Sequence, residues 1–173
     1  MRQPEPHEKT AEAAGEAFWR FSLALYSRPE VAEALIALQD RAGRDVNLML
    51  FALWAGAVRG VRLDAAALVA AEAAIGGLQR DTVEPLRALR RRLKADPDPD
   101  RQALRRKIVA VELAAERRVQ HRLAAMLDGI DRTESDRLAT AAANLALYLG
   151  AESQSAEADV LRNAAAALTR YSS

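Results

Sequence analysis

The feature that most constrains this chain is a short segment near residue 50 that is apolar on nearly every side. Large apolar side chains surround the axis when the segment is placed on a helix: Val46, Leu48, Met49, Leu50, Phe51, Leu53 and Trp54. A surface helix shows one apolar stripe, whereas a helix that is apolar all round is buried. We therefore predict a third helix, over residues 46–59, at the centre of the domain.

The rest of the chain has a composition suited to helices that pack around this segment. Among its 173 residues, 39 are Ala and 23 are Leu, while Val, Ile and Thr together number only 19. Ala and Leu favour helices, and β-branched residues favour strands. A hydrophobic fraction of 50% with a net charge of +1 also argues against disorder. The prediction is an all-α fold, a single compact bundle of about seven helices with a buried third helix.

Glycine, proline and capping residues mark the expected boundaries. Residues 1–9 are expected to form a flexible tail, and residues 10–173 a single helical domain. Gly76-Gly77 is expected to stop the helix that follows Asp64, and the next helix begins with Pro85 in its first turn. The predicted helices cover residues 10–26, 29–42, 46–59, 65–75, 82–95, 100–128, 133–149 and 155–170. If residues 64–95 form one interrupted helix, the count is seven rather than eight.

The longest predicted helix follows the segment Asp96-Pro97-Asp98-Pro99-Asp100, in which each proline disfavours helix at the residue before it. Asp100 is the predicted N-cap. Helical periodicity places six apolar residues on the face expected to cover the core: Leu104, Ile108, Val111, Ala115, Val119 and Met126.

The residues that the sequence lacks exclude several kinds of chemistry. Without cysteine there is no disulfide framework and no thiolate metal site. Glu112 and Glu116 lie one turn apart, but the Glu-x-x-His pairs of di-iron bundles are missing. We expect no metal and no cofactor, and expect these carboxylates to pair with Arg105, with Arg118 or with a neighbouring helix. No catalytic set is apparent, which favours a protein that is not an enzyme.

No apolar leader and no apolar run of about 20 residues is visible, so we expect a cytoplasmic protein without a membrane contact.

A set of aromatic and amide residues in the first third could line a pocket. Such sites combine apolar walls with a few convergent polar groups. The candidate ligand-binding residues are Trp19, Tyr26, Gln39, Asn47 and Trp54. The alternative is structural: Asp45 caps the buried helix, and Gln39 and Asn47 satisfy backbone groups at the turn before it.

Positive charge is concentrated in the middle of the chain. Residues 80–122 carry 13 basic and 7 acidic side chains, a formal charge of +6. Candidate phosphate contacts are Arg90, Arg91, Arg92, Arg105 and Arg106. Nucleic acid is possible but not favoured as a partner, because no aromatic residue for base stacking occurs between residues 55 and 147. Solvated helix faces are the alternative interpretation.

The succession of motifs in the first 60 residues resembles a known family. It reads FWRFSL at residues 18–23, LYSRP at 25–29, ALIALQD at 34–40 and GRDVNLMLF at 43–51. It is similar to the proteobacterial DUF2390 (TIGR02444) group of uncharacterised proteins. The resemblance implies a helical cytoplasmic protein of about this length and brings no catalytic residues with it.

Three functions are therefore open. The first is a non-catalytic interaction or regulatory protein whose partner is another protein or a second copy. Its working surface would be the aromatic first third or the Arg-rich face of residues 87–122. The second is a small enzyme or ligand carrier that uses the predicted pocket. The third is weak binding of nucleic acid or phosphate through the Arg-rich face.

Overall fold

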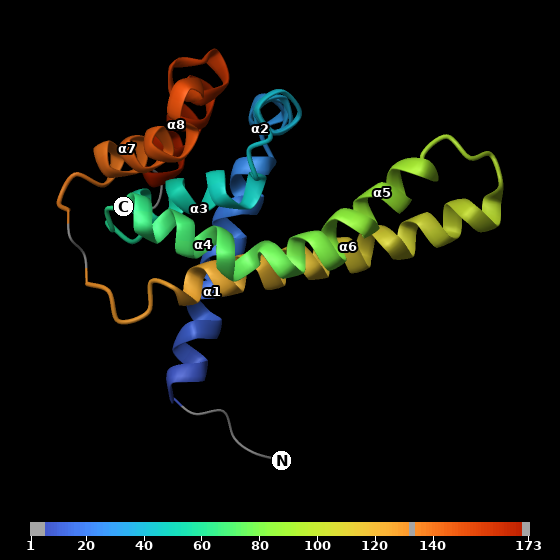
Figure 1. Cartoon of the computed structure of the whole chain (residues 1–173), viewed down its shortest axis with the longest axis horizontal. Helices are drawn as coiled ribbons and strands as arrows, with labels where there is room; N and C mark the ends of the chain where they lie inside the picture. Colours follow the sequence, from blue (N-terminus) through green and yellow to red (C-terminus); the bar gives the residue numbers. More distant parts are fainter. Residues whose placement is uncertain (1–5, 132–133, 171–173) are drawn as a thin grey trace.

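Helix α3 (Val46–Ala57) runs through the centre of the fold, and all twelve of its residues are buried. The computed structural model describes residues 6–131 and 134–170, with side chains over 10–131 and 134–168. Helices α1, α2, α6, α7 and α8 all contact α3 (Figure 1). The predicted buried third helix is confirmed.

All the regular elements in the described residues are helices, and the predicted all-α bundle is confirmed. Besides α3, they are α1 (Pro6–Tyr26), α2 (Pro29–Ala42), α4 (Ala65–Leu78), α5 (Glu84–Arg92), α6 (Pro99–Ala125), α7 (Arg137–Leu149) and α8 (Ala156–Arg170). A π-helical turn, η1 (Gln79–Val83), joins α4 to α5, and a 3-10 turn, η2 (Gly150–Gln154), joins α7 to α8. Helix α1 begins four residues before the expected start, while residues 1–5 of the predicted tail lie outside the described residues.

Local side-chain chemistry sets most helix starts. Three aspartates hold N-cap positions, each accepting hydrogen bonds from backbone N–H groups of the first turn: Asp45, Asp64 and Asp136. The predicted cap Asp45 and the predicted start after Asp64 are confirmed, whereas α7 begins at Arg137 rather than at residue 133. The predicted cap of α6 is wrong, because Asp98 rather than Asp100 holds that position. Pro99 takes the first helical position, where its missing N–H costs nothing. The Asp98 carboxylate then accepts from the N–H of Asp100 at 2.8 Å.

The predicted stop at Gly76-Gly77 is also wrong, since α4 continues through both glycines. The wide turn η1 follows, and Pro85 lies just beyond it. Proline lacks an N–H, and its ring crowds the carbonyl four residues earlier, here that of Asp81 within η1. A wider π turn relieves that crowding without ending the helix. Residues 65–92 therefore form one interrupted rod, and the count of seven helices holds.

The face of α6 predicted to cover the core is confirmed in part, because Ile108, Ala115 and Val119 are buried. Leu104 and Val111 are 51% and 55% exposed, whereas Glu112 and Gln120 are 5% and 3% exposed. The reason is that α5 and the first half of α6 leave the bundle as an antiparallel pair, which we call the α5–α6 arm (residues 84–112; Figure 1). Side chains on its outer side have no core to cover. No described helix is both long enough and apolar enough to cross a membrane.

Helices α3 and α7 approach each other closely at Gly56. A Cβ atom added to Gly56 would lie 2.3 Å from the backbone nitrogen of Ala141 on α7. Real Cβ atoms do not come so close to backbone, so only glycine permits this contact.

Asn144 on α7 fixes the loop that follows α3. Its side chain is fully buried, and its Oδ1 accepts a hydrogen bond from the N–H of Leu63 at 2.9 Å. Its Nδ2 donates to the carbonyls of Val61 at 2.9 Å and Ala52 at 3.3 Å. The amide therefore has partners on both of its polar atoms, as a buried polar group requires.

Candidate ligand-binding cavity

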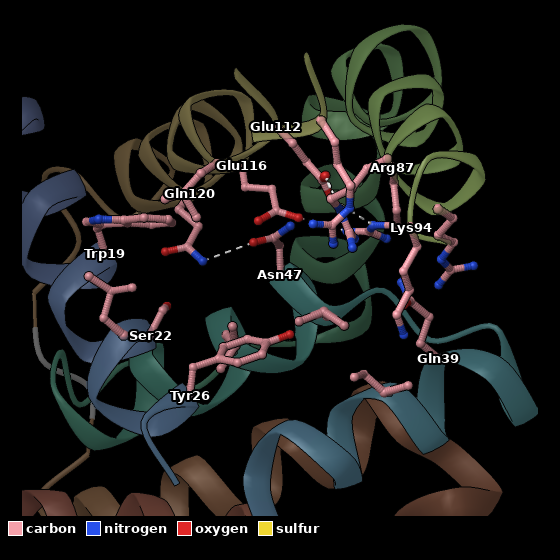
Figure 2. Close-up of a pocket in the computed structure, with 18 residues that line it drawn as sticks. Trp19, Ser22, Tyr26, Gln39, Asn47, Arg87, Lys94, Glu112, Glu116 and Gln120 are labelled. Carbon is pink, nitrogen blue, oxygen red and sulfur yellow. Dashed lines mark hydrogen bonds and ion pairs between the residues drawn. The ribbon is translucent and has the colours of Figure 1, made fainter. Parts of the chain in front are cut away.

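A cavity of about 650 Å³ lies between helices α1, α2 and α3 on one side and helices α5 and α6 on the other (Figure 2). Small-molecule sites occupy roughly 300–1,000 Å³, so the volume suits a small organic molecule. The lining combines apolar, amide, hydroxyl, basic and acidic side chains. These are Trp19, Ser22, Leu23, Tyr26, Ile36, Gln39, Val46, Asn47, Leu50, Arg87, Arg90, Arg91, Lys94, Arg105, Glu112, Leu113, Glu116 and Gln120.

Four of the five residues predicted to form a pocket line this cavity: Trp19, Tyr26, Gln39 and Asn47. The fifth, Trp54, is fully buried in the core, where its ring stacks on Phe18 with centroids 5.0 Å apart. Trp54 lies seven residues, about 10 Å, farther along α3 than Asn47. The cavity reaches Val46, Asn47 and Leu50 at the start of α3, which leaves Trp54 beneath it.

Three of the five predicted phosphate contacts also line the cavity: Arg90, Arg91 and Arg105. Arg92 and Arg106 are exposed and do not belong to the lining. Helical spacing explains the difference, because lining residues on and just after α5 recur at positions 87, 90, 91 and 94, which share one face. Arg87 was not among the predicted contacts, although this spacing points to it.

The floor of the cavity is a pair of buried amides. Gln120 on α6 donates from Nε2 to Oδ1 of Asn47 on α3 at 3.0 Å. The side chain of Asn47 therefore bonds to another helix and not to the preceding turn. In that turn, the Asp45 side chain accepts hydrogen bonds from the backbone N–H groups of Asn47 and Leu48 at 2.8 and 3.1 Å. The capping role expected of Asp45 is confirmed.

Two buried oxygens in the lining have no hydrogen-bond partner within the described part of the chain: Oγ of Ser22 and Oε1 of Gln120. The two side chains are 2% and 3% exposed. Buried polar atoms are paired in the great majority of cases, so both are places where a bound molecule can supply the partner. Neither residue was predicted. The signal was available for Ser22, which shares a helix face with Trp19 and Tyr26.

Two carboxylates on α6 are held by guanidinium groups from α5. Arg90 Nε lies 2.5 Å from Oε2 of Glu112, and an Arg87 terminal nitrogen lies 2.8 Å from Oε1 of Glu116. The expectation that a neighbouring helix partners these glutamates is confirmed. Among the described residues, no group of three or more His, Asp and Glu side chains is placed to hold a metal ion.

Burial also perturbs titration in the cavity. Desolvation raises the pKa of Glu116, although the Arg87 guanidinium opposes the change. Desolvation likewise raises the pKa of Tyr26, and the nearby charge of Glu116 adds to it. The lining carries five basic and two acidic side chains, so its formal charge is +3.

The π turn η1 ties the two sides of the cavity together. Gln79 in η1 donates from Nε2 to Oδ2 of Asp45, the residue that caps α3. Burial raises the pKa of Asp45, while the hydrogen bonds from Leu48, Asn47 and Gln79 oppose that change. This contact fixes the start of α5 relative to α3. The basic face of α5, with Arg87, Arg90 and Arg91, therefore lines the cavity.

Comparison with known sequences identifies a family. The sequence model of a family described as protein of unknown function (DUF2390) matches residues 17–123. That stretch contains every residue of the cavity lining, whereas α7 and α8 lie beyond it. Neither a curated protein nor a solved structure matches the chain.

Proposed function

The chain belongs to the DUF2390 family of proteins of unknown function, and from that premise we propose that it is a non-catalytic protein that binds a small organic molecule in the cavity. The observation that carries the proposal is the pair of buried, unpartnered oxygens of Ser22 and Gln120 in the lining. Leaving a buried acceptor unpaired costs about 1–3 kcal/mol, which a ligand donor would recover.

Apolar groups supply the rest of the expected affinity. Trp19 and Tyr26 flank the cavity, and three apolar side chains at its mouth are 47–48% exposed: Leu23, Ile36 and Leu113. Covering them removes apolar surface from water, which favours binding by about 25 cal/mol per Å². The combination of aromatic walls and a few inward polar atoms is typical of ligand sites.

The absence of catalysis is part of the proposal. A serine nucleophile requires a base within hydrogen-bond reach, and Ser22 Oγ has no such partner among the described residues. Glu112 and Glu116 are each engaged by a guanidinium group. These carboxylates hold the wall of the cavity together.

The test is equilibrium binding of a neutral fluorescent probe, N-phenyl-1-naphthylamine. We expect saturable binding to the intact chain and its loss in Ile36→Trp, which fills the mouth of the cavity. The matched control is Leu104→Trp, at an equally exposed helical position outside the lining. Equal binding by both variants, or no binding by the intact chain, would contradict the proposal.

Binding of another protein or a second copy is a second candidate function. It is favoured by the exposed Leu104 and Val111 on the outer side of the α5–α6 arm. Light scattering of the intact chain and of Leu104→Arg, together with affinity capture from the native cell, tests it. Cytoplasmic location and binding of nucleic acid stay predictions, to be checked by cell fractionation and by an electrophoretic shift at low salt.

A further inference from the structure

The geometry points to the chemical class of the ligand, an inference that rests on the proposed function. We propose that the cavity takes an amphipathic organic anion. Its carboxylate or phosphate group would lie against Arg91, Lys94 and Arg105, and its apolar body would lie between Trp19 and Tyr26.

The basic side chains of the lining fall into two groups, those that form an ion pair and those that do not. Arg87 and Arg90 pair with the two glutamates of α6. Arg91, Lys94 and Arg105 form no ion pair with any described residue. Three cations without a counter-charge therefore face one cavity, and an anion is the ligand that would balance them.

Arg105 gives an independent sign of the same chemistry. Its Nε atom is buried and has no hydrogen-bond partner among the residues described. A guanidinium group offers five N–H donors in a planar fork that matches the two oxygens of a carboxylate or phosphate. An acidic group at this end of the cavity would supply the missing acceptor.

The opposite end of the cavity is lined by aromatic rings, with the Ser22 hydroxyl group beside them. In Figure 2, Trp19 and Lys94 lie at opposite ends of the group of lining side chains, with Asn47 and Gln120 between them. Ser22 and Tyr26 lie on the Trp19 side. A ligand with a charged head and an aromatic or aliphatic body can therefore contact both ends at once, and a hydrogen-bond donor on that body would supply the partner that the oxygens of Ser22 and Gln120 lack. A compact anion would leave the aromatic walls uncovered.

Calorimetric titration with four naphthalene probes tests the charge preference, because the apolar body is constant. The probes are 2-naphthoate, 2-naphthyl phosphate, 2-naphthylmethanol and 2-naphthylmethylamine. We expect the preferred anion to bind at least about tenfold more tightly than the alcohol, and the amine to bind most weakly. The two anions distinguish a carboxylate from a phosphate ligand. Raising the salt concentration should weaken the anions and leave the alcohol unchanged.

The variant Arg91→Gln/Lys94→Gln locates the anion. We expect it to weaken the preferred anion about tenfold and to leave the alcohol unchanged. The matched control is Arg92→Gln, which removes an exposed charge from the same helix outside the lining and should change neither. Both positions 91 and 94 are exposed, so the variants are expected to fold normally.

The outcomes separate this inference from the proposed function. Equal affinity for anion and alcohol, or an equal loss in Arg92→Gln, would overturn the anion preference while the ligand-binding proposal stood. Binding of none of the four probes would overturn both.

Discussion

Among the described residues, buried amide side chains lie at the α3–α7 contact, at the cavity floor and in η1, and the first two places treat them differently. At the α3–α7 contact, Asn144 is fully buried and makes three hydrogen bonds, all to backbone groups. At the cavity floor, Asn47 and Gln120 bond to each other, and Oε1 of Gln120 lacks a partner among the described residues.

The difference distinguishes a structural polar group from one available to a ligand. A side chain that satisfies backbone groups of a loop cannot be released without exposing those groups, so Asn144 belongs to the fold. An amide pair that leaves one acceptor facing a cavity retains bonding capacity. We therefore expect substitutions at the α3–α7 contact to change stability, and substitutions at the cavity floor to change binding.

The largest expected effect is that of Asn144→Leu. It would leave the N–H of Leu63 and the carbonyl of Val61 buried without partners, which we expect to lower the free energy of unfolding by about 4 kcal/mol. Urea denaturation measures the change. The control is Asn163→Leu at an exposed position of α8, expected within about 0.5 kcal/mol of the unchanged chain. A similarly small change in the free energy of unfolding of both variants would contradict a structural role for Asn144.

Gly56→Ala should have the next largest effect. The new methyl group would collide with the backbone of Ala141, and separating α3 from α7 should cost about 3 kcal/mol. Thermal unfolding measures it. Gly76→Ala is the matched control, since a Cβ there meets nothing within 4 Å and should stabilise the helix by up to about 1 kcal/mol. Stabilisation by both substitutions would show that α3 and α7 are less closely packed than described.

The double variant Asn47→Leu/Gln120→Met tests the other side of the comparison. Replacing both members of a bonded pair by apolar groups is nearly neutral, so we expect a change in the free energy of unfolding below about 1 kcal/mol. Binding of the naphthalene anion should fall because the floor loses its polar atoms. Loss of stability with unchanged binding would show that this pair has a structural role and not a ligand-binding role.

The smallest expected effects concern pH, with one carboxyl in the ion pair between α2 and α8 and the other in the cavity. Hydrogen bonding to Arg41 lowers the pKa of Glu157 from 4.5 to about 2, so this group contributes stability above pH 4.5 that is lost as the pH falls toward 2. Burial raises the pKa of Glu116, so the sign is opposite: stability falls as the pH rises above 4.5. The unfolding temperature, measured from pH 2.5 to 7, should fall less at acid pH in Glu157→Gln than in the unchanged chain. In Glu116→Gln, it should decline less as the pH rises toward 7. If both substitutions changed the pH dependence of the unfolding temperature in the same direction, the opposite effects expected of Glu157 and Glu116 would be contradicted.

Local signals in the sequence predicted most of the fold. The apolar circumference of α3 predicted its burial, and side-chain capping predicted the starts of α3 and α4. The errors arose where tertiary structure outweighs a local signal. Gly76-Gly77 disfavours a helix, yet α4 continues into η1, whose Gln79 bonds to Asp45. Two residues of the α6 stripe, Leu104 and Val111, were misassigned because the sequence does not show that the arm leaves the core.

The candidate site was predicted as two unrelated sets, one aromatic and one basic. Their meeting depends on the return of the chain through the α4–α5 rod and α6. This return brings Arg91 into the same lining as Gln39 and places Gln120 beside Asn47. No local pattern encodes that proximity. A polar stripe on α6, at Glu112, Glu116 and Gln120, was nevertheless readable at helical spacing beside Ile108 and Val119.

The two tryptophans allow the central claim to be tested most directly, because one lines the cavity and the other lies in the core. The measurement is a two-dimensional ¹H–¹⁵N NMR titration of the chain with 2-naphthoate, with the two indole N–H signals assigned through Trp19→Phe. We expect the Trp19 signal to shift saturably while the Trp54 signal stays in place. A Trp19 signal that does not move, or an equal shift of both, would contradict a ligand site in this cavity.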